Sequence, residues 1–193
     1  MRPKKSVRMQ IGGKMVYLFL ADGFEELEAL TQVDLLRRAG IGIKTVSVTS
    51  SKTVTGAHKI ATNADILFSE SDYSDAELLF LPGGMPGTTN LSNHEGLCNL
   101  LLKKYESNVR IAAICAAPSI LGKLGILDNK TATCYPGFEG KLGSANYVNK
   151  KVVTDGIVTT SCGVGGAIEC ALELIRLLKD GQTAKNILEG ILY

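Results

Sequence analysis

The 193-residue sequence predicts a single doubly wound α/β domain of flavodoxin-like type, with a mostly parallel sheet and helices on both faces. Three observations support this prediction. Short runs rich in Val, Ile, Leu and Phe recur along the chain, as is typical of parallel strands buried on both faces. Stretches with helical spacing separate most of these runs. The sequence contains no internal repeat and no linker-like stretch, so the domain is expected to cover residues 15–193.

The first predicted unit consists of a strand, a helix and a second strand, at residues 14–20, 25–39 and 43–49. The helix follows a short loop, carries acids in its first turn, where the helix dipole favours them, and ends at Gly40. Its apolar residues recur at the spacing of an amphipathic helix: Leu27, Leu30, Val33 and Leu36. Two strands joined in this way should be parallel, with a right-handed crossover.

The remaining elements are predicted from the same periodicities. Residues 54–65 alternate over a short distance and indicate a small hairpin off the main sheet. Further strands are predicted at residues 77–81, 109–114, 130–134, 151–154 and 157–161, with a turn at Asp155-Gly156 joining the last two. Helices are predicted at residues 95–105, 118–124, 166–178 and 183–192.

The composition excludes several classes of protein. With 45% hydrophobic and 21% charged residues, the chain is typical of a globular domain. Its two histidines, His58 and His94, are far apart, so no histidine-rich metal centre is expected. The odd number of widely spaced cysteines, without a CxxC pair, argues against a disulfide scaffold or a zinc site and favours a reducing cytosol: Cys98, Cys115, Cys134, Cys162 and Cys170.

Residues 1–14 are basic and are interpreted as a flexible leader without a catalytic role. An upstream start codon, with Met15 as the usual first residue, and an organelle address are the alternatives. The leader holds five of the 21 basic side chains and no acid, which leaves 16 basic against 19 acidic residues, a net charge of −3. No nucleic-acid surface is therefore expected. The sequence also has no apolar stretch long enough to span a membrane.

Residues 109–121 (VRIAAICAAPSIL) carry the strongest chemical signal. An apolar strand passes without loop residues into small residues and Pro118, which can start a helix. Cys115 therefore falls at a strand-to-helix corner, where a side chain points toward a cleft. Amides at the helix N-terminus favour an anion, so we expect them to lower the thiol pKa and make Cys115 a nucleophile. The alternative is a buried structural cysteine.

The loops at the carboxyl ends of the predicted strands supply partners for this thiol. The backbone N–H groups of Gly84 and Ala116 could form an oxyanion hole, which requires fixed donors aimed where negative charge develops. A nearby carboxyl group could accept a hydrogen bond from the thiol or, if burial keeps it protonated, shuttle a proton. Glu28 is the candidate, since Glu25 and Glu26 are explained well as surface charges.

The glycine-rich stretches alone are weak signals. Gly83-Gly84 belongs to neither a dinucleotide-binding fingerprint nor a P-loop. Residues 163–166 (GVGG) precede a helix and could bind phosphate, although a tight turn explains them equally well.

Taken together, these motifs resemble the ThiJ/PfpI superfamily, and most closely its small cytosolic branch, which contains the parkinsonism-associated protein deglycase and the bacterial ThiJ-like proteins. The resemblance covers about residues 15–193. It rests on the joint occurrence, in this order, of ADGFEELEAL (21–30), LPGGMPG (81–87), AAICAAPSIL (112–121), ATCYPGFE (132–139) and TSCGVGGAIECAL (160–172).

The resemblance implies a flavodoxin-like fold, usually dimeric, cytoplasmic and independent of a cofactor. It implies that Cys115 is the elbow nucleophile and redox-sensitive thiol, that Glu28 is hydrogen-bonded to it, and that Gly84 and Ala116 supply the oxyanion-hole amides. Activities of the superfamily include glyoxalase-type conversion of methylglyoxal, repair of early glycation adducts on protein side chains, oxidative-stress sensing and a chaperone role.

The chain departs from the superfamily pattern at two positions. Hydrolase-like members have a histidine where this chain has Tyr135, so a full Cys-His-acid triad and peptidase activity are not expected. Many relatives have an arginine at the position of Cys162, which places a second thiol near Cys115. We hypothesise that Cys162 or Cys134 could resolve an oxidised Cys115 as a disulfide; the alternative is an uninvolved small residue. His58, on the hairpin, is a candidate substrate contact.

Three functions remain open. The first is an enzyme that acts on reactive carbonyls such as methylglyoxal, or on glycated side chains, through Cys115. The second is a non-catalytic redox sensor or chaperone in which Glu28 stabilises oxidised Cys115. The third, a thiazole-phosphate biosynthesis enzyme, has only an old family label behind it, because no ATP-binding loop is visible.

Overall fold

A seven-stranded sheet forms the centre of the computed structural model, which describes residues 14–193. Its order is β10-β11-β7-β6-β1-β2-β5, and every neighbouring pair is parallel except β10 and β11. The strands are β1 (Met15–Leu20), β2 (Ile43–Ser47), β5 (Ile66–Leu67), β6 (Ala76–Leu81), β7 (Arg110–Ile114), β10 (Val152–Asp155) and β11 (Val158–Ser161). The predicted mostly parallel α/β fold is confirmed. The leader proposed for residues 1–14 lies, apart from Lys14, outside the described residues.

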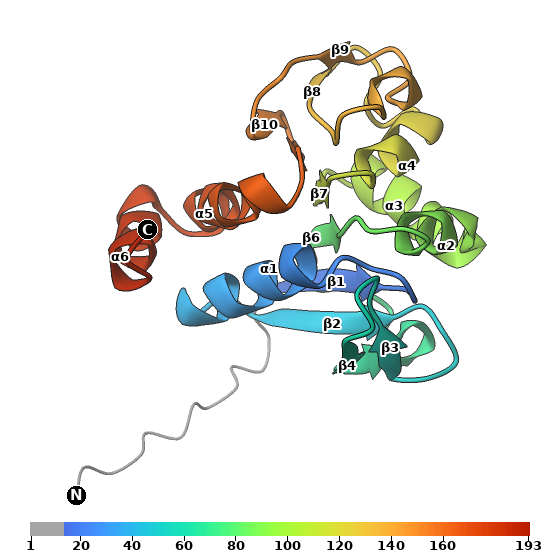
Figure 1. Cartoon of the computed structure of the whole chain (residues 1–193), viewed down its shortest axis with the longest axis horizontal. Coiled ribbons are helices and arrows are strands. Elements are labelled where there is room, and N and C mark those ends of the chain that lie inside the picture. The colour runs from blue at the N-terminus through green and yellow to red at the C-terminus, as the bar shows by residue number, and fades with distance from the viewer. Residues whose placement is uncertain (1–13) are drawn as a thin grey trace, which may run out of the picture.

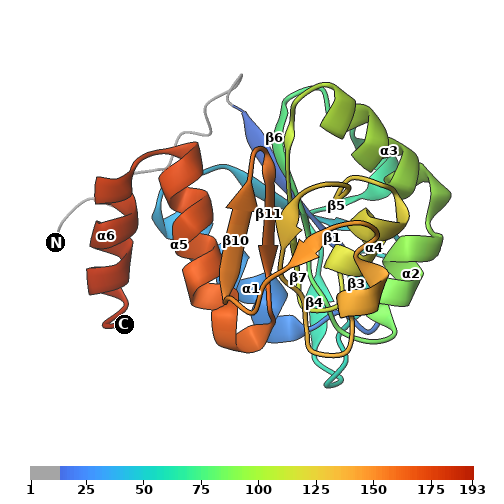
Figure 2. The ribbon, with the colours of Figure 1, turned by 90° about the horizontal axis from the view of Figure 1, so that it is seen from above.

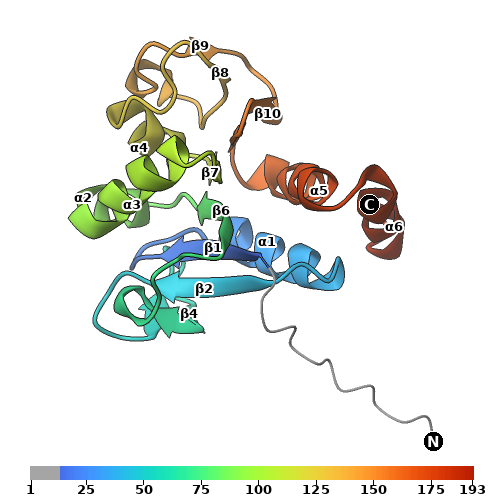
Figure 3. The same cartoon turned by 180° about the vertical axis from the view of Figure 1, so that it is seen from behind.

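Helices cover both faces of this sheet (Figure 1). They are α1 (Glu26–Arg38), α2 (Gly87–Asn93), α3 (Glu95–Glu106), α4 (Pro118–Lys123), α5 (Ala167–Leu178) and α6 (Gly181–Gly190). One core lies under α1 and α5, and the other under α2, α3 and α4, as the view from behind also shows (Figure 3). Helix α6 packs on the outside of α5 (Figure 2).

Strand β1 shows why the sheet has two apolar faces. Successive side chains of a strand point to opposite faces. Val16 and Leu18 accordingly belong to the core under α1 and α5, whereas Tyr17 and Phe19 belong to the core under α2, α3 and α4. All four are at most 2% exposed. This double burial explains the continuous apolar run from which the strand was predicted.

Two small sheets lie beside the main one. Strands β3 (Thr53–Thr55) and β4 (Ala61–Asn63) form the predicted hairpin. Of the short strand predicted at residues 130–134, only β8 (Thr131–Ala132) is extended; it lies outside the main sheet and pairs with β9 (Asn146–Tyr147). Helix α2 and strand β5 were not predicted. The former is rich in Gly, Thr, Asn and Ser, which form helices poorly in isolation, and the latter has only two residues.

The buried face of α1 differs from the predicted one. Leu27 and Leu30 are 59% and 38% exposed, while Ala29, Val33 and Leu36 face the core. Glu26 is 3% exposed and Glu25 is 9% exposed, so their interpretation as surface charges is also wrong. The first turn of α1 meets the β3–β4 hairpin, and this tertiary contact buries acids that a single helix would leave in water.

Candidate active site

Cys115 occupies the predicted strand-to-helix corner. Strand β7 ends at Ile114, and α4 begins at Pro118. The φ angle of Cys115 is 65°, which a non-glycine residue adopts only at a cost of about 1–2 kcal/mol. Its backbone N–H donates to Ser161 O at 2.9 Å, and its carbonyl accepts from the N–H of Tyr135 at 2.8 Å. Two neighbouring segments therefore hold the strained corner in place.

Glu28 lies fully buried beside this corner. It stands in the first turn of α1, where its backbone N–H donates to the carboxylate of Glu25 at 2.7 Å. Oε2 of Glu28 accepts from the N–H of Gly83 at 2.9 Å, and Oε1 has no hydrogen-bond partner within residues 14–193. A buried carboxyl group, held by the loop after β6, therefore stands beside the thiol.

Gly83 separates the carboxyl group from the thiol. A Cβ atom added at this glycine would lie 2.7 Å from Oε2 of Glu28, 2.6 Å from Cβ of Cys115 and 3.0 Å from its Sγ. No larger residue fits there unless one of these groups moves. The glycines after this buried strand indicated a tight turn and a close approach of the backbone to a ligand, but not that Gly83 would lie beside both Glu28 and Cys115.

The backbone N–H groups of Gly84 and Ala116 both face the sulfur of Cys115, and both act to lower its pKa. This is the placement expected of oxyanion-hole donors. Gly84 has a φ of 90°, and a Cβ atom added there would lie 2.4 Å from the backbone nitrogen of Glu25. The loop after β6 thus brings its amides to the thiol only because residue 84 is a glycine.

The prediction of a lowered thiol pKa is wrong for the free protein. Burial raises the pKa of the Cys115 thiol to about 12, and the neighbouring Glu28 charge adds to this effect. Burial also raises the pKa of Glu28 to about 7, against the opposing effects of the Cys115 thiol and the Gly83 N–H. The two amides therefore do not overcome the loss of water. Near neutral pH Glu28 is poised to take up or release a proton.

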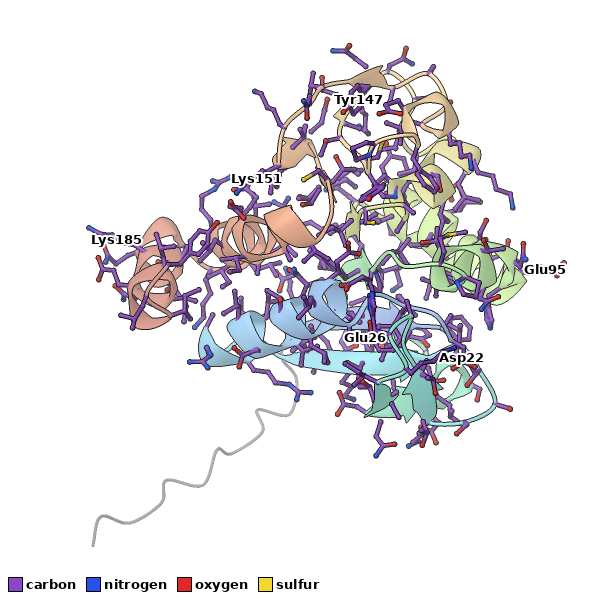
Figure 4. The ribbon with its side chains drawn as sticks, viewed as in Figure 1. Asp22, Glu26, Glu95, Tyr147, Lys151 and Lys185 are labelled. Carbon is purple, nitrogen blue, oxygen red and sulfur yellow. The ribbon has the colours of Figure 1, made fainter. Side chains whose placement is uncertain are left out.

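His58 fastens the β3–β4 hairpin to the start of α1. Its Nδ1 lies 2.8 Å from Oε2 of Glu26, and its backbone N–H donates to Oε1 of the same carboxylate at 2.8 Å (Figure 4 labels Glu26). The hydrogen bond to Glu26 raises the pKa of the exposed His58 ring. Burial acts to raise the Glu26 pKa, but the bond to His58 and the backbone donors outweigh it, so that this pKa is lowered.

We predict that His58 titrates above the ordinary pKa of 6.5 because of this bond. In Glu26→Gln, which keeps the shape but loses the charge, the pKa of His58 should fall back toward the ordinary value. The measurement is a pH titration of the ring resonances by NMR, and His94 serves as the internal reference. Identical His58 titrations in the wild type and the variant would contradict the ion pair.

An open cleft of about 810 Å³ joins these groups. It is lined by every side chain singled out in the sequence: Glu28, His58, Cys115, Cys134, Tyr135 and Cys162. Residues that were not predicted to belong to the site also line it, among them Leu27, Ile60, Pro136 and Asn149, together with residues 163–165 of the GVGG stretch. The lining comes from six separate segments of the chain, and only folding shows that these segments meet.

The other two thiols of the cleft differ in accessibility. Cys134 is 1% exposed, and burial raises its pKa to about 11, while Cys162 is half-buried. All the cysteines among the described residues are free thiols. Pairing of Cys162 or Cys134 with an oxidised Cys115 stays a prediction. Intact mass after mild peroxide checks it, since two added oxygens (about +32 Da) without thiol pairing would contradict it.

Three side chains of the cleft lie close enough together to be considered as metal ligands. Glu25, Glu26 and His58 each place one ligand atom within 4.8 Å of the others. The ring of His58 and the carboxylate of Glu26 already bond to each other, which is an ordinary ion-pair geometry.

In residues 14–193 no helix is both long and apolar enough to cross a membrane.

Comparison with known proteins supports the assignment of the fold. The model of the DJ-1/PfpI family matches residues 14–177. The chain is 39% identical over 178 residues to protein DJ-1 homolog A of Arabidopsis thaliana, and the match covers 90% of this chain and 45% of the relative. The chain therefore spans less than half the length of the two Arabidopsis relatives that it matches. It is 29% identical over 166 residues to deglycase TK1284 of Thermococcus kodakarensis, covering 85% of this chain and 99% of the relative.

A solved structure has the same fold as this chain. Oxidized Toxoplasma gondii DJ-1 superposes with a TM-score of 0.90 and 32% sequence identity, covering 94% of this chain and 99% of that one. Both the family match over most of the chain and this close likeness in fold lead to the same conclusion. The protein belongs to the DJ-1/PfpI family.

Proposed function

We propose that the protein is a cysteine-dependent enzyme that acts on reactive carbonyls or glycation adducts, in the manner of a glyoxalase or deglycase. The observation that carries this proposal is the position of the Cys115 thiol beside a buried carboxyl group, that of Glu28, and beside two backbone N–H donors, those of Gly84 and Ala116. The similarity to a protein named deglycase supports it. The reaction derived below requires no cofactor.

In the first step, Cys115 adds to the aldehyde carbon of methylglyoxal. The new S–C bond forms as the carbonyl π bond becomes an oxyanion, which the N–H groups of Gly84 and Ala116 stabilise. The thiol proton passes to the Glu28 carboxylate and from there to the oxyanion, which gives a hemithioacetal. A Glu28 pKa of about 7 suits a group that must both accept and donate this proton near neutral pH.

In the second step, the same carboxylate removes the proton from the former aldehyde carbon, which gives an enediolate, and returns it to the neighbouring carbonyl carbon, while the hydroxyl proton passes to the neighbouring carbonyl oxygen. The product is a thioester of lactate on Cys115. Water then cleaves the thioester and releases lactate and the free thiol, so the sum is methylglyoxal plus water to lactic acid. On a glycated side chain, the S–C bond forms as the bond between the same carbon and the amine of the carrier breaks, the thiol proton leaves with the amine, and the hemithioacetal that results follows the same route.

The test is lactate production from methylglyoxal, with and without glutathione, by the wild type, Cys115→Ser and Glu28→Ala. We expect turnover by the wild type and a loss on the order of 10³-fold in each variant. Circular dichroism of the variants controls for unfolding. Turnover that survives in a folded Cys115→Ser protein would contradict the proposal.

A redox sensor or chaperone is the second candidate, and the similarity to a DJ-1 structure described as oxidized supports it. The raised pKa of Cys115 slows both turnover and oxidation by peroxide, because the thiolate is the reacting form in each case. If the wild type produces no lactate, peroxide titration of Cys115 tests this candidate. A third alternative, thiazole-phosphate biosynthesis, gains no support from the cleft, since none of its described lining residues is a lysine or arginine that could bind phosphate.

The dimeric state and the cytoplasmic location implied by the family resemblance belong to the same proposal. The exposed Leu27 and Leu30 side chains on α1 support a contact with a second copy, because such side chains are commonly covered at interfaces.

A further inference from the structure

The charges that line the cleft are unbalanced. Among the described lining residues are three carboxyl groups, Glu25, Glu26 and Glu28, and none of these residues is a lysine or arginine. The one basic side chain, His58, is held by Glu26 at 2.8 Å and lies 3.8 Å from Glu25, so its charge is already paired. A reacting Cys115 adds a further negative charge as the thiolate.

The nearest lysines do not correct this imbalance. Lys59 and Lys150 adjoin lining residues in sequence and Lys151 follows Asn149 by two residues, but none of the three lines the cleft. Lys151 pairs with Glu169 on α5 and lies on the β10 side of the molecule, apart from Glu26 at the start of α1 (Figure 4). A charge at that site is also screened by salt over about 8 Å.

The rest of the mouth is apolar. Ile60 and Tyr135 are each more than half exposed, and Val164 is 44% exposed. A wall of low polarity strengthens the field of the buried carboxylates, because fewer water molecules screen it. An anionic reactant entering this cleft therefore meets negative charge without a cation to pair with.

We propose that this cleft selects reactants by charge, admitting neutral and cationic carbonyl compounds to Cys115 and discriminating against those that carry a carboxylate. The substrates would then be free aldehydes or their adducts on cationic carriers such as lysine- and arginine-like groups. Carboxylate-bearing carriers would be poor substrates. This choice of substrate rests on the function proposed above, whereas the charge selection itself is testable without turnover.

The decisive experiment measures how fast Cys115 reacts with three methanethiosulfonates of graded charge: the trimethylammonioethyl (+1), methyl (0) and sulfonatoethyl (−1) reagents. In each case the thiolate attacks the sulfenyl sulfur, a disulfide forms and methanesulfinate leaves. Peptide mass spectrometry identifies Cys115 among the cysteines. We expect a ratio of cationic to anionic rates at least about tenfold above that of 2-mercaptoethanol, and this preference should shrink at high salt.

Matched variants assign the preference to the lining. Glu25→Gln retains an oxygen for the N–H of Glu28 but removes a charge, and Ile60→Lys adds a cation at the exposed rim; both should reduce the rate ratio. Ile60→Gln adds polarity without charge and should leave it unchanged. A wild-type ratio equal to that of 2-mercaptoethanol, or no reaction at Cys115 with any reagent, overturns the proposal.

A second readout separates this proposal from the proposed function. Hemithioacetals of methylglyoxal with thiocholine (+1), 2-mercaptoethanol (0) and 3-mercaptopropionate (−1) should be consumed at rates that fall in this order. Turnover without such an order overturns the charge selection and leaves the enzyme standing. Charge-selective labelling of Cys115 without any turnover leaves the selection standing and overturns the enzymatic function.

Discussion

Gly83→Ala is expected to abolish activity and to destabilise the fold. The added methyl group would lie 2.6 Å from Cβ of Cys115 and 2.7 Å from Oε2 of Glu28, distances at which one of them must move. Forcing an extra carbon into a packed site typically costs about 1–3 kcal/mol. Because the displaced groups are the thiol and the carboxyl group themselves, we expect kcat/KM for methylglyoxal to fall by about 100-fold or more.

The matched control is Gly165→Ala. Gly165 lines the same cleft, but a Cβ atom added there has no neighbour within 4 Å. This variant should retain the wild-type Tm and most of the activity. Chemical denaturation and steady-state kinetics of both variants make the comparison. A Gly83→Ala protein with wild-type stability and kinetics would show that the positions of Cys115 and Glu28 do not depend on a glycine at residue 83.

Glu28 should make the protein less stable as the pH rises from about 4.5 to 7. Burial raises the Glu28 pKa from the ordinary 4.5 to about 7 in the folded protein. Between these values the unfolded chain has released this proton and the folded one retains it, so the folded state binds more protons and loses stability with increasing pH. A shift of this size corresponds to about 3 kcal/mol across the window.

The variant Glu28→Gln isolates this contribution, because an amide of the same shape does not titrate. We expect the free energy of unfolding of the wild type to fall by about 3 kcal/mol relative to the variant between pH 4.5 and pH 7. Urea denaturation at several pH values provides the measurement, and taking the difference between the two proteins removes most of the contribution of other groups. A difference that is constant with pH would mean that Glu28 ionises normally in the fold.

In the proposed reaction, transfer of the thiol proton to Glu28 compensates for the raised pKa of Cys115. A protonated Glu28 carries no charge, so it no longer opposes formation of the Cys115 thiolate beside it. The amides of Gly84 and Ala116 then act on the sulfur without this opposition. At rest few molecules carry Cys115 as the thiolate. In the proposed reaction, however, Glu28 can exchange a proton with a bound carbonyl compound.

Local pattern was enough to predict the order of most elements and the corner at Cys115. The buried strands read as continuous apolar runs because both of their faces are covered, and β1, β6 and β7 were therefore found within one or two residues. The corner followed from a strand that meets Pro118 without an intervening loop. Both are properties of neighbouring residues, which a sequence displays directly.

The burial and the pKa values of the site residues depend on contacts between segments that are distant in the sequence. The apolar spacing of α1 suggested Leu27 and Leu30 as part of its inner face, but the hairpin at residues 53–63 meets the first turn of the helix and helps to bury Glu26. The amides at the corner predicted a lowered thiol pKa, yet burial beside Glu28 raised it. Neighbouring residues were thus enough to predict most of the elements and the thiol at the corner. Which carboxyl groups lose their water follows from the folded arrangement, because desolvation is set by everything that surrounds a group.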